Sequence, residues 1–298
     1  MDDRITAGIS ALVTADARIA QTLTTLGRLL DCRPAPAEIL VHVDGNQAAC
    51  ADAIRRAYPQ VRIILNPGRV GPGGGRNALM AAVSYPVAAS FDDDSYPIDA
   101  DYFARVETVM TQHPDAAVVC AGVYHQGERI EPDVLTASWV ADFVGCGCVY
   151  RTIAFRQTAG YVPIPIAYGM EESDLALRLH AGGQRLLFTP WLRVFHDTDR
   201  SRHAAPAVTA ASIRNLALLT YLRYPMTHWP IGVGQCFNRI VWLLKNGRSR
   251  GVLEGLGGIP RQLWTYRSFR RAVAAKQLRS YLSLRQHPVP TDLEQRAP

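Results

Sequence analysis

VAASFDDDS, residues 87–95, is the most informative segment for the fold class of this chain of 298 residues. Small and apolar residues lead into Phe91, and three adjacent aspartates, Asp92 to Asp94, follow at once. A short apolar run of this kind is typical of a buried strand in a parallel sheet, and ligands bind beyond the carboxyl ends of such strands. The three carboxylates repel one another, so they need a cation or hydrogen-bond donors nearby. A solvated acidic turn that caps the next helix is the alternative interpretation.

The same pattern precedes this stretch three times. The runs ISALVTA (9–15), EILVHVD (38–44) and VRIIL (61–65) are predicted to be strands, and helical or polar segments lie between them. Such alternation indicates an α/β fold with a parallel sheet. The polar segments 14–16 and 44–46 are therefore expected at the same sheet edge as the three aspartates.

After the aspartates we expect a helix over 103–110, a strand at 116–122, and a helix at EESDLALRLHAGG (171–183) that ends at paired glycines. QRLLFTP (184–190) and LRVFHD (192–197) are predicted to be two further strands. The stretches 139–150 and 164–169 suit loops that face a substrate. From residue 204 the pattern is helical, with one apolar stripe over 237–244, another over 266–273, and a frayed end over the last dozen residues.

The charge of the chain is unevenly distributed. Of the 32 lysines and arginines 16 lie from residue 200 onward, with only 3 of the 26 aspartates and glutamates, so that part carries +13 and the rest −7. We predict a catalytic domain at 1–223 and a basic, amphipathic helical region at 224–298. Such helices bind anionic membrane surfaces, or they cap the catalytic domain with their arginines in water. No recognised motif supports nucleic-acid binding.

No stretch approaches the ~18 apolar residues of a membrane span, and no signal peptide precedes the first strand. The expected location is the cytoplasm, with peripheral attachment at the inner face of the membrane. The six cysteines are scattered and lack the spacing of a zinc site, so we expect them to be reduced.

The run Gly71-Pro72-Gly73-Gly74-Gly75 precedes Arg76 and Asn77. It is predicted to be a loop, from 67 to 75, before a helix that begins near Asn77. Backbone amides at such a helix start attract phosphate, and Arg76 adds a fixed positive charge. A purely conformational loop is the alternative.

Two further groups of residues are candidates for a catalytic or metal-binding role. Glu171, Glu172 and Asp174 stand at the start of a predicted helix, where they cap it or supply a general base. His196 ends a predicted strand and is either structural or a metal ligand.

In this order the pieces resemble the family 2 glycosyltransferases, whose catalytic domain has the GT-A fold, a Rossmann-like mixed sheet for nucleotide-diphospho-sugars. The resemblance covers about residues 5–223. It lies in the order Thr14-Ala15-Asp16, Asp44, Asn66-x-Gly68-x-x-Gly71, Gly75-Arg76-Asn77, Asp92 to Asp94, Glu171 to Leu175 with Arg178, and His196. Two departures stand out: the usual Pro-Thr-Tyr-Asn after the first strand is Val13-Thr14-Ala15-Asp16, and the usual aspartate base is Glu172.

The resemblance implies roles for these residues. Nucleotide-sugar binding falls to Thr14, Asp16, Asp44, Asn66, Gly71, Gly75, Arg76, Asn77, Asp92 and Asp93. Within that set Asp44 holds the base, and Asp92 holds the ribose or the metal's water shell. Asp94 coordinates Mg²⁺ or Mn²⁺ on the diphosphate, with Asp92 and His196 as further ligands. Glu172 is the base, and Glu171 and Asp174 are its alternatives.

The implied activity is metal-dependent, inverting transfer of a sugar from a UDP-, dTDP- or GDP-sugar to an acceptor hydroxyl. A cell-surface polysaccharide or a lipid-linked oligosaccharide is the expected product. The alternatives are a secondary-metabolite glycosyltransferase and an inactive pseudo-transferase that serves as an assembly partner. A sugar nucleotidyltransferase or a nicotinamide-dependent oxidoreductase would have its glycine-rich loop directly after the first strand, and here the glycines come later.

Overall fold

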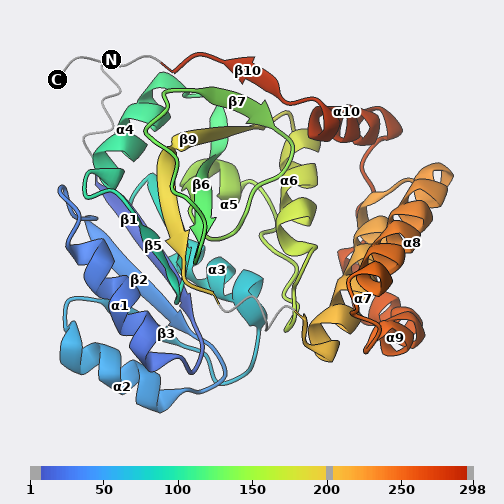
Figure 1. Cartoon of the computed structure of the whole chain (residues 1–298), viewed down its shortest axis with the longest axis horizontal. Coiled ribbons are helices and arrows are strands. Elements are labelled where there is room, and N and C mark those ends of the chain that lie inside the picture. The colour runs from blue at the N-terminus through green and yellow to red at the C-terminus, as the bar shows by residue number, and fades with distance from the viewer. Residues whose placement is uncertain (1–7, 199–203, 294–298) are drawn as a thin grey trace.

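The computed structural model describes residues 8–198 and 204–293. A ten-stranded mixed sheet forms its centre, with helices on both faces (Figure 1). The strands are β1 (Ile9–Ala15), β2 (Glu38–Val43), β3 (Arg62–Leu65), β4 (Val87–Asp92), β5 (Ser95–Pro97), β6 (Ala116–His125), β7 (Ala137–Val140), β8 (Cys148–Arg151), β9 (Arg185–His196) and β10 (Val289–Thr291). The helices are α1 (Ile19–Leu30), α2 (Ala48–Ala57), α3 (Gly71–Ala82), α4 (Tyr102–Gln112), α5 (Thr152–Arg156), α6 (Glu171–Ala181), α7 (Pro206–Arg223), α8 (Trp229–Lys245), α9 (Val252–Thr265) and α10 (Ala275–Gln286). This confirms the predicted α/β class.

The strand order places the predicted polar segments together. The sheet runs β10-β7-β9-β6-β8-β4-β1-β2-β3, and β5 pairs with β9. β4, β1, β2 and β3 are parallel neighbours, so their carboxyl ends share one edge. In this register Thr14 lies between Asp92 on one side and His42 on the other.

Each face of the sheet is covered by its own helices. Leu26 of α1, Ile54 of α2 and Val106 of α4 belong to one buried cluster. Leu79 of α3 and Leu175 of α6 belong to the other cluster, on the opposite side. The apolar residues of the central strands alternate between these two clusters, which is why apolar residues follow one another along these strands.

The glycine run is helical, and the prediction of a loop at 67–75 with a helix from Asn77 is wrong. α3 begins at Gly71. A Cβ on Gly73 would lie 2.5 Å from Oε2 of Glu171, and one on Gly75 would lie 2.6 Å from Nδ1 of His42. The glycines therefore let a helix pass close to its neighbours, and this packing overrides their low helix propensity.

Three other predictions need correction. The two strands expected at 184–190 and 192–197 are one strand, β9, because a register shift between Ala121 and Gly122 of β6 accommodates Pro190. The predicted stripe over 266–273 is not a helix, since only a short 3-10 turn (Arg267–Phe269) forms there. The end of the chain, predicted to fray, adds β10 to the sheet beside β7 over the part that the structure describes.

The C-terminal helices lie to one side of the sheet (Figure 1). α7 packs against both α8 and α9, whereas α10 returns to α6. Among the described residues no helix is long and apolar enough to cross a bilayer. The predicted boundary after residue 223 falls at the end of α7, and it stays a prediction.

Candidate active site

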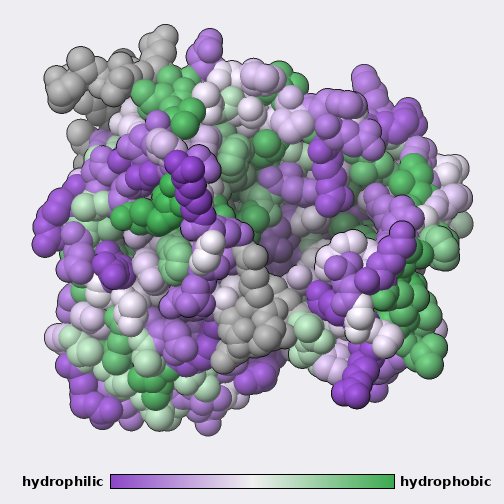
Figure 2. Space-filling model, viewed as in Figure 1, coloured by the Kyte–Doolittle hydropathy of each residue, from purple (hydrophilic) through white to green (hydrophobic). Residues whose placement is uncertain are grey.

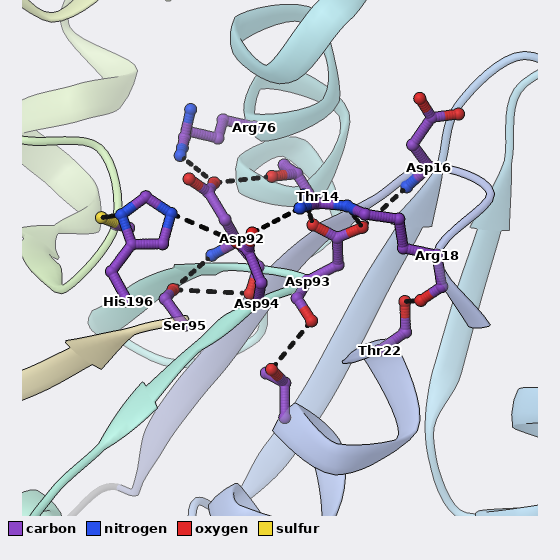
Figure 3. Close-up of polar contacts among 12 residues, drawn as sticks. Thr14, Asp16, Arg18, Thr22, Arg76, Asp92, Asp93, Asp94, Ser95 and His196 are labelled. Carbon is purple, nitrogen blue, oxygen red and sulfur yellow. Dashed lines mark hydrogen bonds and ion pairs between the residues drawn. The ribbon is translucent and has the colours of Figure 1, made fainter. Parts of the chain in front are cut away.

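Asp92 stands at the end of β4 and is the hub of the site (Figure 3). Its Oδ1 accepts a hydrogen bond from Oγ1 of Thr14 at 3.0 Å and from Nη2 of Arg76 at 2.6 Å. The Asp92 side chain is 27% exposed, so it also faces solvent. Its position lets it meet a ligand while two fixed donors orient it.

Arg76 reaches Asp92 from α3 and is buried. Its Nη1 donates to Oε1 of Glu171 at 2.9 Å, and its Nε donates to Oγ of Ser90. Burial alone would lower the pKa of Arg76, but Asp92 and Glu171 raise it well above its usual value. The guanidinium is thus a fixed internal charge that joins β4 to α6. It holds the two acids in place, and its side chain is only 2% exposed.

Asp93 and Asp94 lie in the turn between β4 and β5, and both are buried. The guanidinium of Arg18, from the segment after β1, forms ion pairs with both carboxylates (Figure 3). Burial raises the pKa of Asp93 to about 7 despite Arg18. Burial also tends to raise the pKa of Asp94, but the interactions with His196 and Arg18 outweigh burial, and the pKa is lowered.

Arg18 is a site residue that the sequence analysis missed. It follows Asp16 by two positions in the polar segment after β1, and its charge was the available signal. Only the sheet register shows that this segment faces the aspartates. The repulsion expected among three carboxylates is therefore reduced by two arginines, Arg18 and Arg76.

His196, at the end of β9, completes a group that can hold a divalent cation. One ligand atom each of Asp92, Cys146 and His196 lie within 4.8 Å of one another. Oδ1 of Asp94 lies 3.2 Å from Nε2 of His196 and has no other partner among the described residues. A buried carboxylate oxygen, a half-buried carboxylate and an imidazole fit Mg²⁺ or Mn²⁺. Burial raises the pKa of Cys146 well above its usual value, so that group stays a neutral thiol.

A cleft of ≈ 220 Å³, here called the Asp44 cleft, opens beside these residues. Six predicted residues line it, namely Thr14, Asp16, Asp44, Gly71, Asp92 and Asp93. Three polar residues that were not predicted also line it: Arg18, His42 and Arg69. The carboxylate of Asp44 accepts hydrogen bonds from the backbone N–H groups of Val70 and Gly71, at 2.9 and 3.0 Å. Asp44 therefore also caps the start of α3. The backbone amides of this helix start are the groups that were predicted to attract phosphate.

Four of the predicted nucleotide-sugar residues lie outside the lining of this cleft, and Arg76, described above, is one of them. Asn66 donates to the carbonyl of Gly68 within its own loop. Gly75 packs on His42. Asn77 exchanges two hydrogen bonds with the backbone of Tyr161, at 2.8 and 2.9 Å. In the structure these residues shape the loop and helix around the site.

A second, larger cleft of ≈ 590 Å³, the Glu172 cleft, shares Pro72 and Asp92 with the first. Arg76, Glu171, Glu172 and His196 also line it. The stretches 142–146 and 167–169 form part of its wall, within the segments expected to face a substrate. Arg285, from the distant helix α10, lines it too and pairs with Asp142 at 2.7 Å.

The three acids of α6 have different surroundings. Glu171 is buried against Arg76, and burial together with Glu172 raises its pKa to about 8. Asp174 is fully buried between Arg178 and Arg223. Glu172 is half-buried, and its Oε1 accepts a hydrogen bond from the backbone N–H of Gly145 at 3.2 Å. Burial raises the pKa of Glu172 as well.

The sequence of residues 14–156 matches the family model described as glycosyl transferase family 2. No curated protein matches the chain. Among solved structures, TarS 1–349 of S. aureus in complex with UDP-GlcNAc is similar, with a TM-score of 0.59 and 14% identity over 89% of this chain and 82% of that one. The mannosyltransferase PcManGT of Pyrobaculum calidifontis in complex with GDP-Man and Mn²⁺ has a TM-score of 0.55 and 12% identity over 95% and 88%.

GalNAc-T7 with UDP, GalNAc and Mn²⁺ is also similar, with a TM-score of 0.56 and 14% identity over 74% of this chain. The present chain spans about half of that protein, 48%. At such identities the likeness shows a shared fold, and the family match covers the segments that carry Thr14, Asp44 and Asp92 but not Glu172 or His196. Residues 14–156 of this chain are thus a family 2 glycosyltransferase region, in a structure with the GT-A fold.

Proposed function

We propose that this enzyme transfers a sugar from a nucleoside diphosphate to an acceptor hydroxyl with inversion at the anomeric carbon. The observation that carries the proposal is the meeting of two clefts at Asp92. The Asp44 cleft takes the nucleoside, and the Glu172 cleft takes the donor sugar and the acceptor. The diphosphate then lies between them, beside Asp92 and His196. The donors UDP-GlcNAc and GDP-Man, bound by similar structures, support this donor class.

A divalent cation, Mg²⁺ or Mn²⁺, would be held by Asp94, Asp92 and His196. When bound it supplies Lewis-acid stabilisation of the negative charge on the departing diphosphate. The protein adds fixed charge around that point. Arg76, on α3, orients Asp92 through a hydrogen bond, and Arg18 holds Asp93 and Asp94 in place.

Glu172 is the proposed general base. Glu171 is tied to Arg76 and Asp174 to two arginines, whereas Glu172 lines the cleft and its Oε1 accepts a hydrogen bond from the backbone N–H of Gly145. Its raised pKa brings it closer to neutral pH, where a carboxylate accepts a proton more effectively. The acceptor oxygen loses its proton to Glu172 as it attacks the anomeric carbon, the bond to the diphosphate breaks, and this single displacement inverts the centre.

The basic C-terminal helices are proposed to attach the enzyme to an anionic membrane surface, where a lipid-linked or cell-surface glycan is extended. Trp264, Phe237 and Leu253 are 68%, 65% and 84% exposed on these helices, beside several arginines. Each basic residue near an anionic surface adds about 1 kcal/mol of attraction.

The proposal is tested by turnover of UDP- and GDP-sugars with Mn²⁺, in which NMR follows the anomeric configuration of the released sugar. We expect hydrolysis or transfer with inversion, and its loss in Glu172→Gln. The matched control is Glu107→Gln, an exposed acid on α4. Retention of configuration, or full activity of Glu172→Gln, would contradict the proposed mechanism. No turnover of any donor would favour the pseudo-transferase.

A further inference from the structure

An apolar groove of ≈ 430 Å³ lies in the C-terminal helices, outside both catalytic clefts. α7 packs against both α8 and α9, and side chains of all three helices line the groove. Val233, Phe237 and Ile240 of α8 face Leu256, Ile259 and Leu263 of α9 across it. Figure 2 shows hydrophobic residues gathered over α8 and α9 at the right-hand edge of the molecule.

Glycines let the two helices sit close to α7. A Cβ on Gly232 of α8 would lie 2.1 Å from Oγ1 of Thr220, and one on Gly255 of α9 would lie 3.0 Å from the carbonyl oxygen of Ala210. The larger residues next to these glycines remain uncovered. Val233 and Phe237 are 66% and 65% exposed. A contiguous apolar patch that is exposed to solvent is typical of a binding site.

The rim of the groove, beside the rings of Tyr221 and Trp229, carries two hydrogen-bond donors that have no acceptor among the described residues. The guanidinium of Arg270 lies 4.9 Å from the ring centroid of Tyr221 and 5.5 Å from that of Trp229, and both rings line the groove. Nη1 of Arg270 and Nε1 of Trp229 are buried and have no partner within the described residues. Both donors are therefore available to a ligand with acceptor oxygens.

Together these features select one class of ligand. A hydrocarbon chain fits the apolar walls, and an anionic phosphate fits the two donors and the cation at the rim. A second copy of the chain would bring the same positive charge to the rim and be repelled. The scarcity of acids beyond residue 200 likewise favours an anionic partner.

We infer that this groove binds one acyl chain of an anionic phospholipid, whose phosphate accepts hydrogen bonds from Arg270 and Trp229. The inference deepens the proposed membrane attachment and rests on it. It differs from general surface attraction because it assigns the contact to particular residues. The lipid acts here as an anchor, since α7 separates the groove from the catalytic clefts.

The test uses the full chain and dioctanoyl-phosphatidylglycerol below its micelle concentration, with binding measured by calorimetry. Phe237→Glu and Arg270→Gln are expected to weaken binding about tenfold each, since each removes one part of the site. Ile153→Glu, at an exposed apolar residue of α5, and Arg267→Gln, at an arginine that lies over Trp264, are the matched controls. Both controls are expected to stay within about twofold.

Cys236 gives a second readout, because it lines the groove and is half-buried while the other five cysteines are buried. The lipid is expected to slow its alkylation by iodoacetamide. Equal weakening by Arg267→Gln and Arg270→Gln, or unchanged alkylation, would overturn the assignment. Binding to vesicles with phosphatidylglycerol but not to the short-chain lipid would refute the groove alone. Loss of vesicle binding would refute the attachment too, and donor turnover tests the transferase separately.

Discussion

Nη1 of Arg76 lies 2.9 Å from Oε1 of Glu171, and both side chains are buried. This contact ties α3 to the start of α6 and places the proposed base, Glu172, next to the carboxyl end of β4. The same guanidinium donates to Asp92. One arginine thus sets the distance between the donor side and the acceptor side of the site.

Arg76→Gln is expected to lower the free energy of unfolding by about 3–5 kcal/mol, because it leaves the buried side chain of Glu171 and the carboxylate of Asp92 without the guanidinium that binds them. Urea denaturation measures this loss. Arg69→Gln removes an exposed pair with Asp16 and is expected to change stability by less than about 1 kcal/mol. Equal losses of stability in the two variants would show that the buried ion pairs of Arg76 do not stabilise the fold.

Glu172→Gln is expected to reduce kcat by about 10²–10⁴-fold, since it removes the proton acceptor. The affinity for the nucleoside diphosphate is expected to stay unchanged, because Glu172 lies outside the lining of the Asp44 cleft. Steady-state kinetics and calorimetry with the nucleotide measure the two quantities. A full rate in Glu172→Gln would transfer the role to Glu171 or Asp174.

The free energy of unfolding is expected to fall as the pH rises from about 5 to 8. The folded-state pKa of Glu171, about 8, lies above its usual value of 4.5, so the folded protein keeps a proton that the unfolded chain has released. The stabilisation from this proton is complete below the pKa of Glu171 in the unfolded chain. It is lost as the pH rises through the folded-state pKa of about 8. Glu171→Gln is expected to flatten this dependence, and Glu107→Gln is expected to leave it unchanged.

Arg18→Ala is expected to destabilise the protein by about 2–3 kcal/mol, because two buried aspartates lose their counter-charge and Arg18 itself is partly exposed. Mn²⁺ is expected to restore more stability in this variant than in the parent chain, since the cation then replaces the missing charge. Thermal unfolding with and without Mn²⁺ measures both effects. An equal Mn²⁺ effect in the two proteins would show that Arg18 and the cation do not share these carboxylates.

The strands of the central sheet could be predicted because their apolar runs are short and end in polar residues, as at Asp92 and Thr14. The helix at Gly71–Ala82 could not, because five residues with four glycines favour a loop until the contacts of Gly73 and Gly75 are known. Local propensity carries no information about such close approaches.

The acids and His196 could be predicted as site residues because they stand at the ends of predicted strands or at the start of a predicted helix, in the order of the family that they resemble. Arg18, Cys146 and Arg285 could not be assigned, since each comes from a different part of the chain and gains its position only from the sheet register and the return of α10. Asp44 illustrates the same limit, because it both lines the cleft and caps α3. Its place beside a nucleotide could be predicted, but its hydrogen bonds to the start of α3 depend on that unexpected helix.

The most direct test of the account is thermal stabilisation of the full chain by UDP, dTDP, GDP and CDP, each with and without Mn²⁺ or Mg²⁺. A nucleotide at 100 times its Kd adds about 2.7 kcal/mol to the free energy of unfolding. We predict a metal-dependent rise in Tm with one of these nucleotides, reduced in Asp94→Asn and His196→Ala. A Tm that no nucleotide changes, in the presence of either metal, would contradict the assignment of a donor site at Asp92.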